Sequence, residues 1–183
     1  MASMYQAALD EIGAVFARLD DGAVDEACAR IARARRVVVF GGGRERLQIM
    51  GFAMRLFHMG RDVAVEGDMT TPPVGPGDLF IVTVGPGEIS TALALLGVAR
   101  DAGADIMVLT AQPQGRAARY ANFVLTIPAQ TMADDQGDRV SILPMGSLYE
   151  GALFLLFEVM ILKLRDRLGV TPEQMRANHT NLE

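Results

Sequence analysis

Apolar runs that end in glycine-rich turns alternate along this chain with segments of helical periodicity. The runs 36–40, 79–84 and 105–110 are continuous and rich in aliphatic residues, which is typical of strands buried on both faces of a parallel sheet. Shorter runs at 63–65 and 123–127 predict two further strands. Helices are predicted over 3–19, 23–34, 44–59, 88–102, 116–120 and 147–168, with a last short helix that begins at Pro172.

The alternation of strands and helices predicts an α/β fold with a doubly wound, five-stranded parallel sheet in a flavodoxin-like three-layer sandwich. In such sheets, ligands bind outside the carboxyl ends of the strands. The 183 residues fit a single domain: 1–34 supply N-terminal helices, 35–127 the sheet with its helices, and 146–183 the C-terminal helices and tail. Residues 128–145 are polar, and a loop of this length favours a functional segment.

Composition and charge exclude several classes of function. The net charge is −5 and no basic run exceeds Arg35-Arg36, which argues against nucleic acid as the main partner. The most apolar stretch, 151–164, is shorter than a membrane span and contains charged residues, so it predicts a helix buried in the core or in a subunit interface, with no membrane partner. The single Cys28 and the acidic residues near the N-terminus favour a cytoplasmic protein.

The turn after the first predicted strand is a candidate anion site. Its glycines, 41–43, allow close backbone approach to a ligand, and Arg44 and Arg46 stand at the following helix N-terminus. A dinucleotide fingerprint fails here, because its third glycine would fall on Arg46. Glu66 does stand where a ribose-binding acid would lie, so a nicotinamide cofactor remains the weaker alternative.

A second turn offers Gly85, Gly87 and Ser90 to a ligand, although Pro86 lacks an N–H and Glu88 opposes a negative charge. A rigid turn without a ligand explains this segment equally well.

The third turn leads into the long helix. Ser147 is expected to be its N-cap, and Glu150 follows at the spacing of a capping box, so a structural role for Glu150 competes with an acid–base role. His179, in a terminal segment, would on its own be interpreted as a solvated side chain.

Together these motifs resemble 6-phospho-3-hexuloisomerases, small enzymes with a sugar isomerase (SIS) domain, over nearly the whole chain. The matching motifs are Gly41-x-Gly43-Arg44, Phe52-Ala53-Met54-Arg55-Leu56-x-His58-x-Gly60, Thr70-Thr71-Pro72, Leu143-Pro144-Met145-Gly146-Ser147-x-x-Glu150 and His179-x-Asn181-Leu182. The resemblance implies that 3-keto and 2-keto hexose 6-phosphates are interconverted through an enediol, without metal or cofactor, by a homotetramer. It also implies that Glu150 and His179 are the acid–base residues. The expected substrate-binding residues are Gly41, Gly43, Arg44, Arg46, Gly85, Gly87, Ser90, Thr71, Ser147 and Asn181.

The phosphate-binding loops depart from the family pattern. The family resembles G-x-G-R-S followed by S-G-S-G-x-T, whereas here the four hydroxyl positions hold Glu45, Val84, Pro86 and Ile89. Lost hydrogen bonds would weaken a phosphate site, and Glu45 and Glu88 would repel a dianion.

Three functions remain open from the sequence. The first is isomerisation of a sugar with an altered terminal group, either a sulfonate, a carboxylate, or a phosphate held by Arg44 and Arg46. The second is an ordinary phosphohexulose isomerase with a displaced pocket, and the third a non-catalytic sugar-binding protein. Retention of Glu150 and His179 favours an enzyme, and we expect its sites to combine residues of more than one subunit.

Overall fold

The computed structural model describes residues 3–136 and 140–182. The strands are β1 (Val37–Gly41), β2 (Val63–Val65), β3 (Leu79–Thr83), β4 (Asp105–Thr110) and β5 (Phe123–Thr126). They form one sheet in the order β2-β1-β3-β4-β5, and every neighbouring pair is parallel. The predicted five-stranded parallel sheet is confirmed. The strand order reverses between β1 and β3, which is where such sheets bind ligands.

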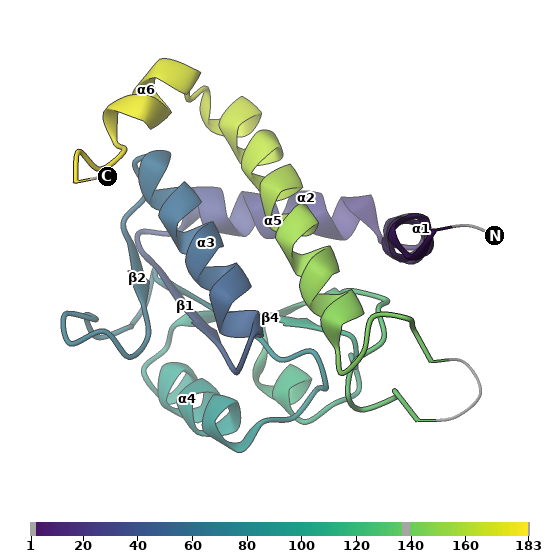
Figure 1. The fold of residues 1–183 in the computed structure, drawn as a ribbon. Coiled ribbons are helices and arrows are strands. Elements are labelled where there is room, and N and C mark those ends of the chain that lie inside the picture. Colours follow the sequence, from purple (N-terminus) through teal and green to yellow (C-terminus); the bar gives the residue numbers. More distant parts are fainter. Residues whose placement is uncertain (1–2, 137–139, 183) are drawn as a thin grey trace.

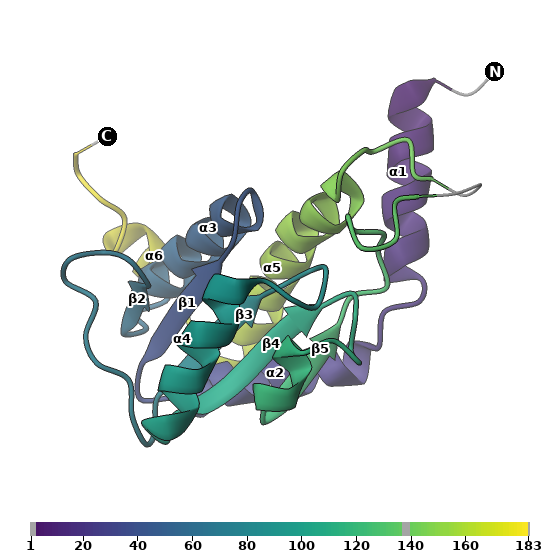
Figure 2. The same ribbon diagram turned by 90° about the horizontal axis from the view of Figure 1, so that it is seen from below.

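Helices cover both faces of the sheet (Figures 1 and 2). The helices are α1 (Met4–Phe16), α2 (Asp21–Arg33), α3 (Glu45–His58), α4 (Ser90–Asp101), α5 (Ser147–Leu168) and α6 (Pro172–Ala177), with a 3₁₀ turn η1 (Ala117–Tyr120). The side chains of alternate strand residues lie in two apolar layers, one on each face of the sheet. Val39 and Ile81 pack with α2, α3 and α5, whereas Phe40 and Val82 pack with α4 and η1. The period of two in a strand produces this division, because successive side chains point to opposite faces.

Helices α3 and α5 pack directly against each other. Phe52 stacks on Phe157 with ring centroids 4.4 Å apart, and Arg55 Nε lies 3.1 Å from Glu158 Oε1. These contacts join the second half of α3 to the middle of α5.

The predicted cap of α5 is wrong. Gly146, not Ser147, is the N-cap, with a left-handed backbone (φ 81°) and no side-chain hydrogen bond. Ser147 is therefore already helical, and its hydroxyl accepts a hydrogen bond from Arg44 Nη2 at 2.9 Å. With no capping box at this helix, the structural explanation for Glu150 is removed.

Helix α1 and the turn that follows it anchor the described parts of the loop 128–145. Arg18 Nη2 donates to the carbonyl of Pro128 at 2.7 Å. Glu11 accepts hydrogen bonds from the hydroxyl of Ser141 and from the backbone N–H of Ile142. The N-terminal helix thus positions a loop that reaches the ligand-binding edge of the sheet.

Helix α2 holds the only cysteine. Cys28 is buried, and burial raises the pKa of its thiol to about 11. None of the helices in the described ranges is long and apolar enough to cross a membrane.

Candidate functional site

A cavity of about 520 Å³ opens at the carboxyl ends of β1 and β3, at the point where the strand order reverses. Its walls come from the turn after β1 (residues 42–45), the turn after β3 (Pro86 and Ile89), the loop residues 131–132, and the segment that enters α5. Three of the four walls are turns or helix starts that the sequence had singled out. Their convergence makes this cavity the candidate active site.

Arg44 and Glu150 form the charged pair of the cavity. Arg44 Nη2 lies 2.7 Å from Glu150 Oε2 and also donates to the Ser147 hydroxyl and to the carbonyl of Met145. The side chain of Glu150 is 16% exposed and that of Arg44 is 56% exposed. Burial raises the pKa of Glu150, and the adjacent guanidinium opposes that rise. A partly desolvated carboxylate held in one orientation is suited to proton abstraction.

Arg44→Gln is expected to move the acidic limb of the kcat/KM pH profile to higher pH. Removing the cation leaves burial unopposed, so the pKa of Glu150 rises further and the ionised base forms only at higher pH. Ser147→Ala removes a hydrogen bond of Arg44 but leaves the charge of Arg44 in place. The acidic limb of the Ser147→Ala profile should therefore stay near that of the wild type. An acidic limb at the same pH in Arg44→Gln and wild type would contradict this electrostatic link.

Glu45, the first residue of α3, points into the floor of the cavity and is only 7% exposed. Both of its oxygens accept from the backbone N–H of Gly85, at 3.0 and 3.1 Å, and Oε2 also accepts from Thr83 Oγ1 at 2.6 Å. The hydroxyl of Tyr149 lies 3.2 Å from Thr83 Oγ1. Burial raises the pKa of Glu45, the hydrogen bonds from Thr83 and Gly85 lower it, and the charge of Glu150 raises it.

Two of the predicted glycines are required by this close packing. A Cβ at Gly85 would lie 2.9 Å from Glu45 Oε1 and from Tyr149 Cδ1, and one at Gly41 would lie 2.9 Å from Thr83 Cγ2. Gly43 borders the cavity, whereas Gly87 forms the turn after β3. The sequence assigned the amide of Gly85 to a ligand, but in the structure that amide donates to Glu45.

Several other predicted residues lie outside the cavity. Arg46 Nη2 donates to the carbonyl of Glu66 at 2.6 Å, and its Nη1 lies 3.6 Å from the Glu66 carboxylate. Glu88 is exposed and pairs with Arg116 at 2.6 Å. Ser90 is an exposed residue at the start of α4. Of the two expected cationic contacts, only Arg44 faces the cavity.

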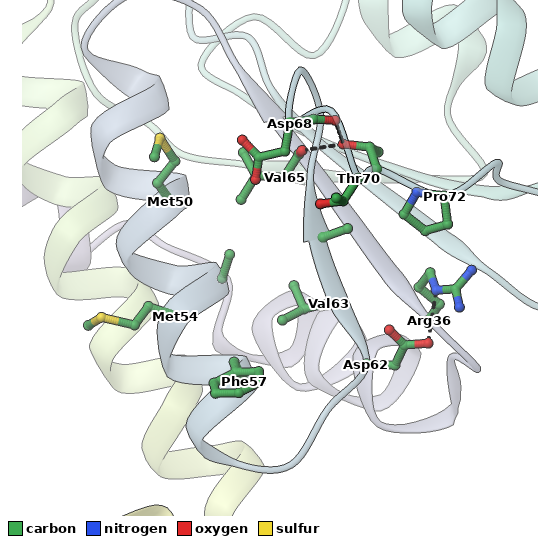
Figure 3. Close-up of a pocket in the computed structure, with 13 residues that line it drawn as sticks. Arg36, Met50, Met54, Phe57, Asp62, Val63, Val65, Asp68, Thr70 and Pro72 are labelled. Atoms are coloured by element: carbon green, nitrogen blue, oxygen red, sulfur yellow. Dashed lines mark hydrogen bonds and ion pairs between the residues drawn. The ribbon is translucent and has the colours of Figure 1, made fainter. Parts of the chain in front are cut away.

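Thr71 lies on the far side of α3, beside a second cavity of about 560 Å³ (Figure 3). Figure 3 shows this cavity between α3, which carries Met50 and Phe57, and the strand β2 with the turn that follows it. The hydroxyl of Thr71 donates to the carbonyls of Val65 and Asp68. Thr71 therefore stabilises this turn and does not line the cavity of Glu150.

A single chain does not bring His179 to Glu150. Glu150 is at the start of α5, while His179 follows α6 beyond the opposite end of that helix (Figure 1). The His179 ring lies 5.0 Å from the ring of His58, at the last residue of α3. With a rise of 1.5 Å per residue, that point is roughly 20 Å from Glu45 at the other end of α3. Asn181 is exposed in the same tail.

The sequence interpretation missed Thr83 and Tyr149, and it named Glu45 only as a repulsive departure. One signal was available for Thr83: it is a polar residue at the carboxyl end of a fully buried strand, the edge where ligands bind. Nothing in the sequence distinguished Tyr149 from the apolar residues around it. Its partner became visible only when α5 was placed against β3.

Comparison with known proteins agrees with this architecture. The SIS domain family model matches residues 30–154. A 3-hexulose-6-phosphate isomerase of Mycobacterium gastri is 37% identical over 95% of this chain and 87% of its own length, and one of Bacillus subtilis is 31% identical over 96% and 95%. A crystal structure of a hypothetical protein from Methanococcus jannaschii, whose authors inferred a 3-hexulose-6-phosphate isomerase, matches with a TM-score of 0.84 and 23% identity over 98% of both chains. The chain therefore belongs to the SIS domain family.

Proposed function

We propose that this protein is a sugar isomerase that moves a carbonyl group along a hexose with an anionic terminal group, through an enediol and without a cofactor. The observation that carries the proposal is the carboxylate of Glu150, which lines the cavity at the switch point and is held there by Arg44. The relatives named 3-hexulose-6-phosphate isomerase support the reaction class. Because of these names, a phosphorylated ketohexose is the substrate against which other sugars are compared.

Glu150 would act as the base. Its carboxylate takes the proton from the carbon beside the carbonyl, the carbonyl oxygen gains a proton, and a cis-enediol results. The proton then returns to the former carbonyl carbon, while the hydroxyl on the carbon that was first deprotonated loses its proton and becomes the new carbonyl, which completes the shift. Arg44 would hold the Glu150 carboxylate in place for this step. His179 would move protons between the oxygens or assist ring opening.

We further propose a homotetramer in which His179 of one subunit completes the cavity of another. The family resemblance supplies the number four, and the separation of His179 from Glu150 within one chain supports a contribution from a second copy. Exposed apolar side chains on two neighbouring helices support an interface: Leu47, Met50, Met54 and Phe57 on α3, and Phe154, Leu155, Val159 and Leu162 on α5.

A non-catalytic sugar-binding protein is the second candidate. It is favoured by one observation, the loss of all four hydroxyls from the positions where the family binds phosphate. The retained Glu150, free of any capping role, argues for the enzyme.

Turnover distinguishes the two candidates. We expect conversion of 3-hexulose 6-phosphate, or of its 6-sulfonate or 6-carboxylate counterpart, with kcat on the order of 1–10³ s⁻¹. A coupled assay with each sugar measures it, and a thermal-shift experiment on the same samples reports binding. Stabilisation by one of these sugars without conversion of any of them would favour the binding protein.

A further inference from the structure

The carboxylate of Glu45 lines the cavity at the switch point and accepts a hydrogen bond from the backbone N–H of Gly85. Without Glu45, this N–H could donate to an anionic ligand. The contacts of Glu45 are all donors: the N–H of Gly85 and the hydroxyl of Thr83. Because Thr83 gives its only proton to Glu45, the Tyr149 hydroxyl must donate to Thr83 Oγ1. The network therefore ends on an anionic acceptor that the protein itself supplies.

Positions 85–87 of the turn after β3 offer no backbone N–H to a phosphate. The N–H of Gly85 donates to Glu45, Pro86 has no N–H, and the N–H of Gly87 donates to the carbonyl of Val84 at 2.9 Å. Ile89 gives an aliphatic side chain to the cavity wall. Three consecutive backbone positions are thus closed to an incoming anion.

The charged residues that line the cavity also disfavour a phosphate. Among the described residues that line it, Arg44 is the only cation, and two carboxylates, Glu45 and Glu150, line it as well. A dianion beside Glu45 would add two negative charges to a partly enclosed site, and like charges in such a place cost affinity.

We propose that Glu45 determines the substrate specificity of this site. Its carboxylate holds the Gly85 amide in place of a substrate phosphate, and the site accepts a hexose whose terminal group carries at most one negative charge. This inference rests on the proposed isomerase function and narrows its substrate. A sulfonate fits the remaining cation, because the planar guanidinium of Arg44 can hold two of its oxygens without a loop amide.

Calorimetry with three probes tests the proposal. Fructose 6-phosphate, 6-deoxy-6-sulfofructose and fructose are titrated into wild type, Glu45→Ser and Glu88→Gln at about pH 8, where the phosphate monoester is a dianion. Wild type should bind the sulfonate about tenfold or more tightly than the phosphate, and fructose is the reference for binding without a terminal charge. Glu45→Ser should strengthen phosphate binding by about tenfold or more and change sulfonate binding by less than about threefold. Glu88→Gln removes a carboxylate outside the cavity and should keep the wild-type ratios.

Glu45→Gln provides a second variant, since it keeps the side-chain shape and removes the charge. It should also bind the phosphate more tightly than wild type, and thermal melts establish that each variant is folded. Phosphate binding in wild type as tight as that of the sulfonate would overturn the proposal. So would an unimproved phosphate affinity in both Glu45 variants, or the failure of all three sugars to bind.

The ratios of the binding affinities for the three sugars do not depend on turnover. Each of the two proposals can therefore be refuted while the other stands. An active isomerase that prefers the phosphate would refute the role of Glu45 alone. A protein with the expected ratios that converts no sugar would refute the isomerase function alone.

Discussion

Replacing Glu150 by glutamine is expected to lower kcat by about 10²- to 10⁴-fold, the usual contribution of a positioned general base. The amide keeps the shape of the side chain and can still accept a hydrogen bond from Arg44, so the cavity should persist while proton abstraction is lost. Substrate affinity should change far less than kcat, because the carboxylate acts mainly in the transition state. Steady-state kinetics on the best substrate of the panel measure both quantities.

The matched control is Glu26→Gln. Glu26 is also an ion-paired glutamate, 2.9 Å from Arg30, but it lies on α2 and does not line the cavity. Its kcat should remain within about twofold of wild type, as expected for a surface change remote from the site. A Glu150→Gln enzyme with wild-type kcat would remove Glu150 from the role of base.

Mixing two inactive variants is expected to restore activity. A Glu150→Gln chain still supplies His179, and a His179→Ala chain still supplies Glu150. If each site takes one of these residues from each of two subunits, random reassembly of equal amounts yields roughly a quarter of the sites with both native residues. The physical basis is the separation of the two residues within one chain, where His179 packs beside His58 at the far end of α3.

A chain that carries both substitutions is the control for this experiment. It can supply neither residue, so its mixture with either single variant should stay inactive. The chains are mixed under mild dissociating conditions, reassembled and assayed, with sedimentation velocity to confirm that mixed oligomers form. Mixed oligomers of the two single variants without recovered activity would show that the sites are not shared in this way.

The sequence predicted the architecture well because a strand buried on both faces leaves a direct trace in the chain. The bounds of β2 and β4, and of α5, agree with the predicted ranges, and the other elements differ by a few residues at their ends. Each of these predictions depends on local periodicity, which a single sequence contains.

Side-chain partners were less predictable, because they depend on which elements the fold brings together. Arg44 and Arg46 are two residues apart, yet one faces Glu150 and the other faces Glu66. The sequence treated Glu45 and Glu88 alike as repulsive carboxylates, but the first is buried in the cavity floor and the second pairs with Arg116. The helical phase at the start of α3 and the position of the turn after β3 decide these outcomes.

The position of His179 was beyond prediction for a different reason. The family resemblance places His179 and Glu150 in the same site. In one chain, however, His179 lies beside the last residue of α3 and Glu150 lies beside the start of that helix. The proposed homotetramer would bring them together through a neighbouring copy.

Deuterium incorporation during turnover tests the central claim most directly. The wild-type protein is incubated in D₂O with the sugar it converts best, and the product is followed by proton and carbon nuclear magnetic resonance. Our account predicts conversion with deuterium from solvent at the carbon that receives the proton, and formation of this product at least about 10²-fold more slowly by Glu150→Gln. Conversion at the wild-type rate in the Glu150→Gln variant, or a wild-type product that carries no deuterium at that carbon, would contradict it.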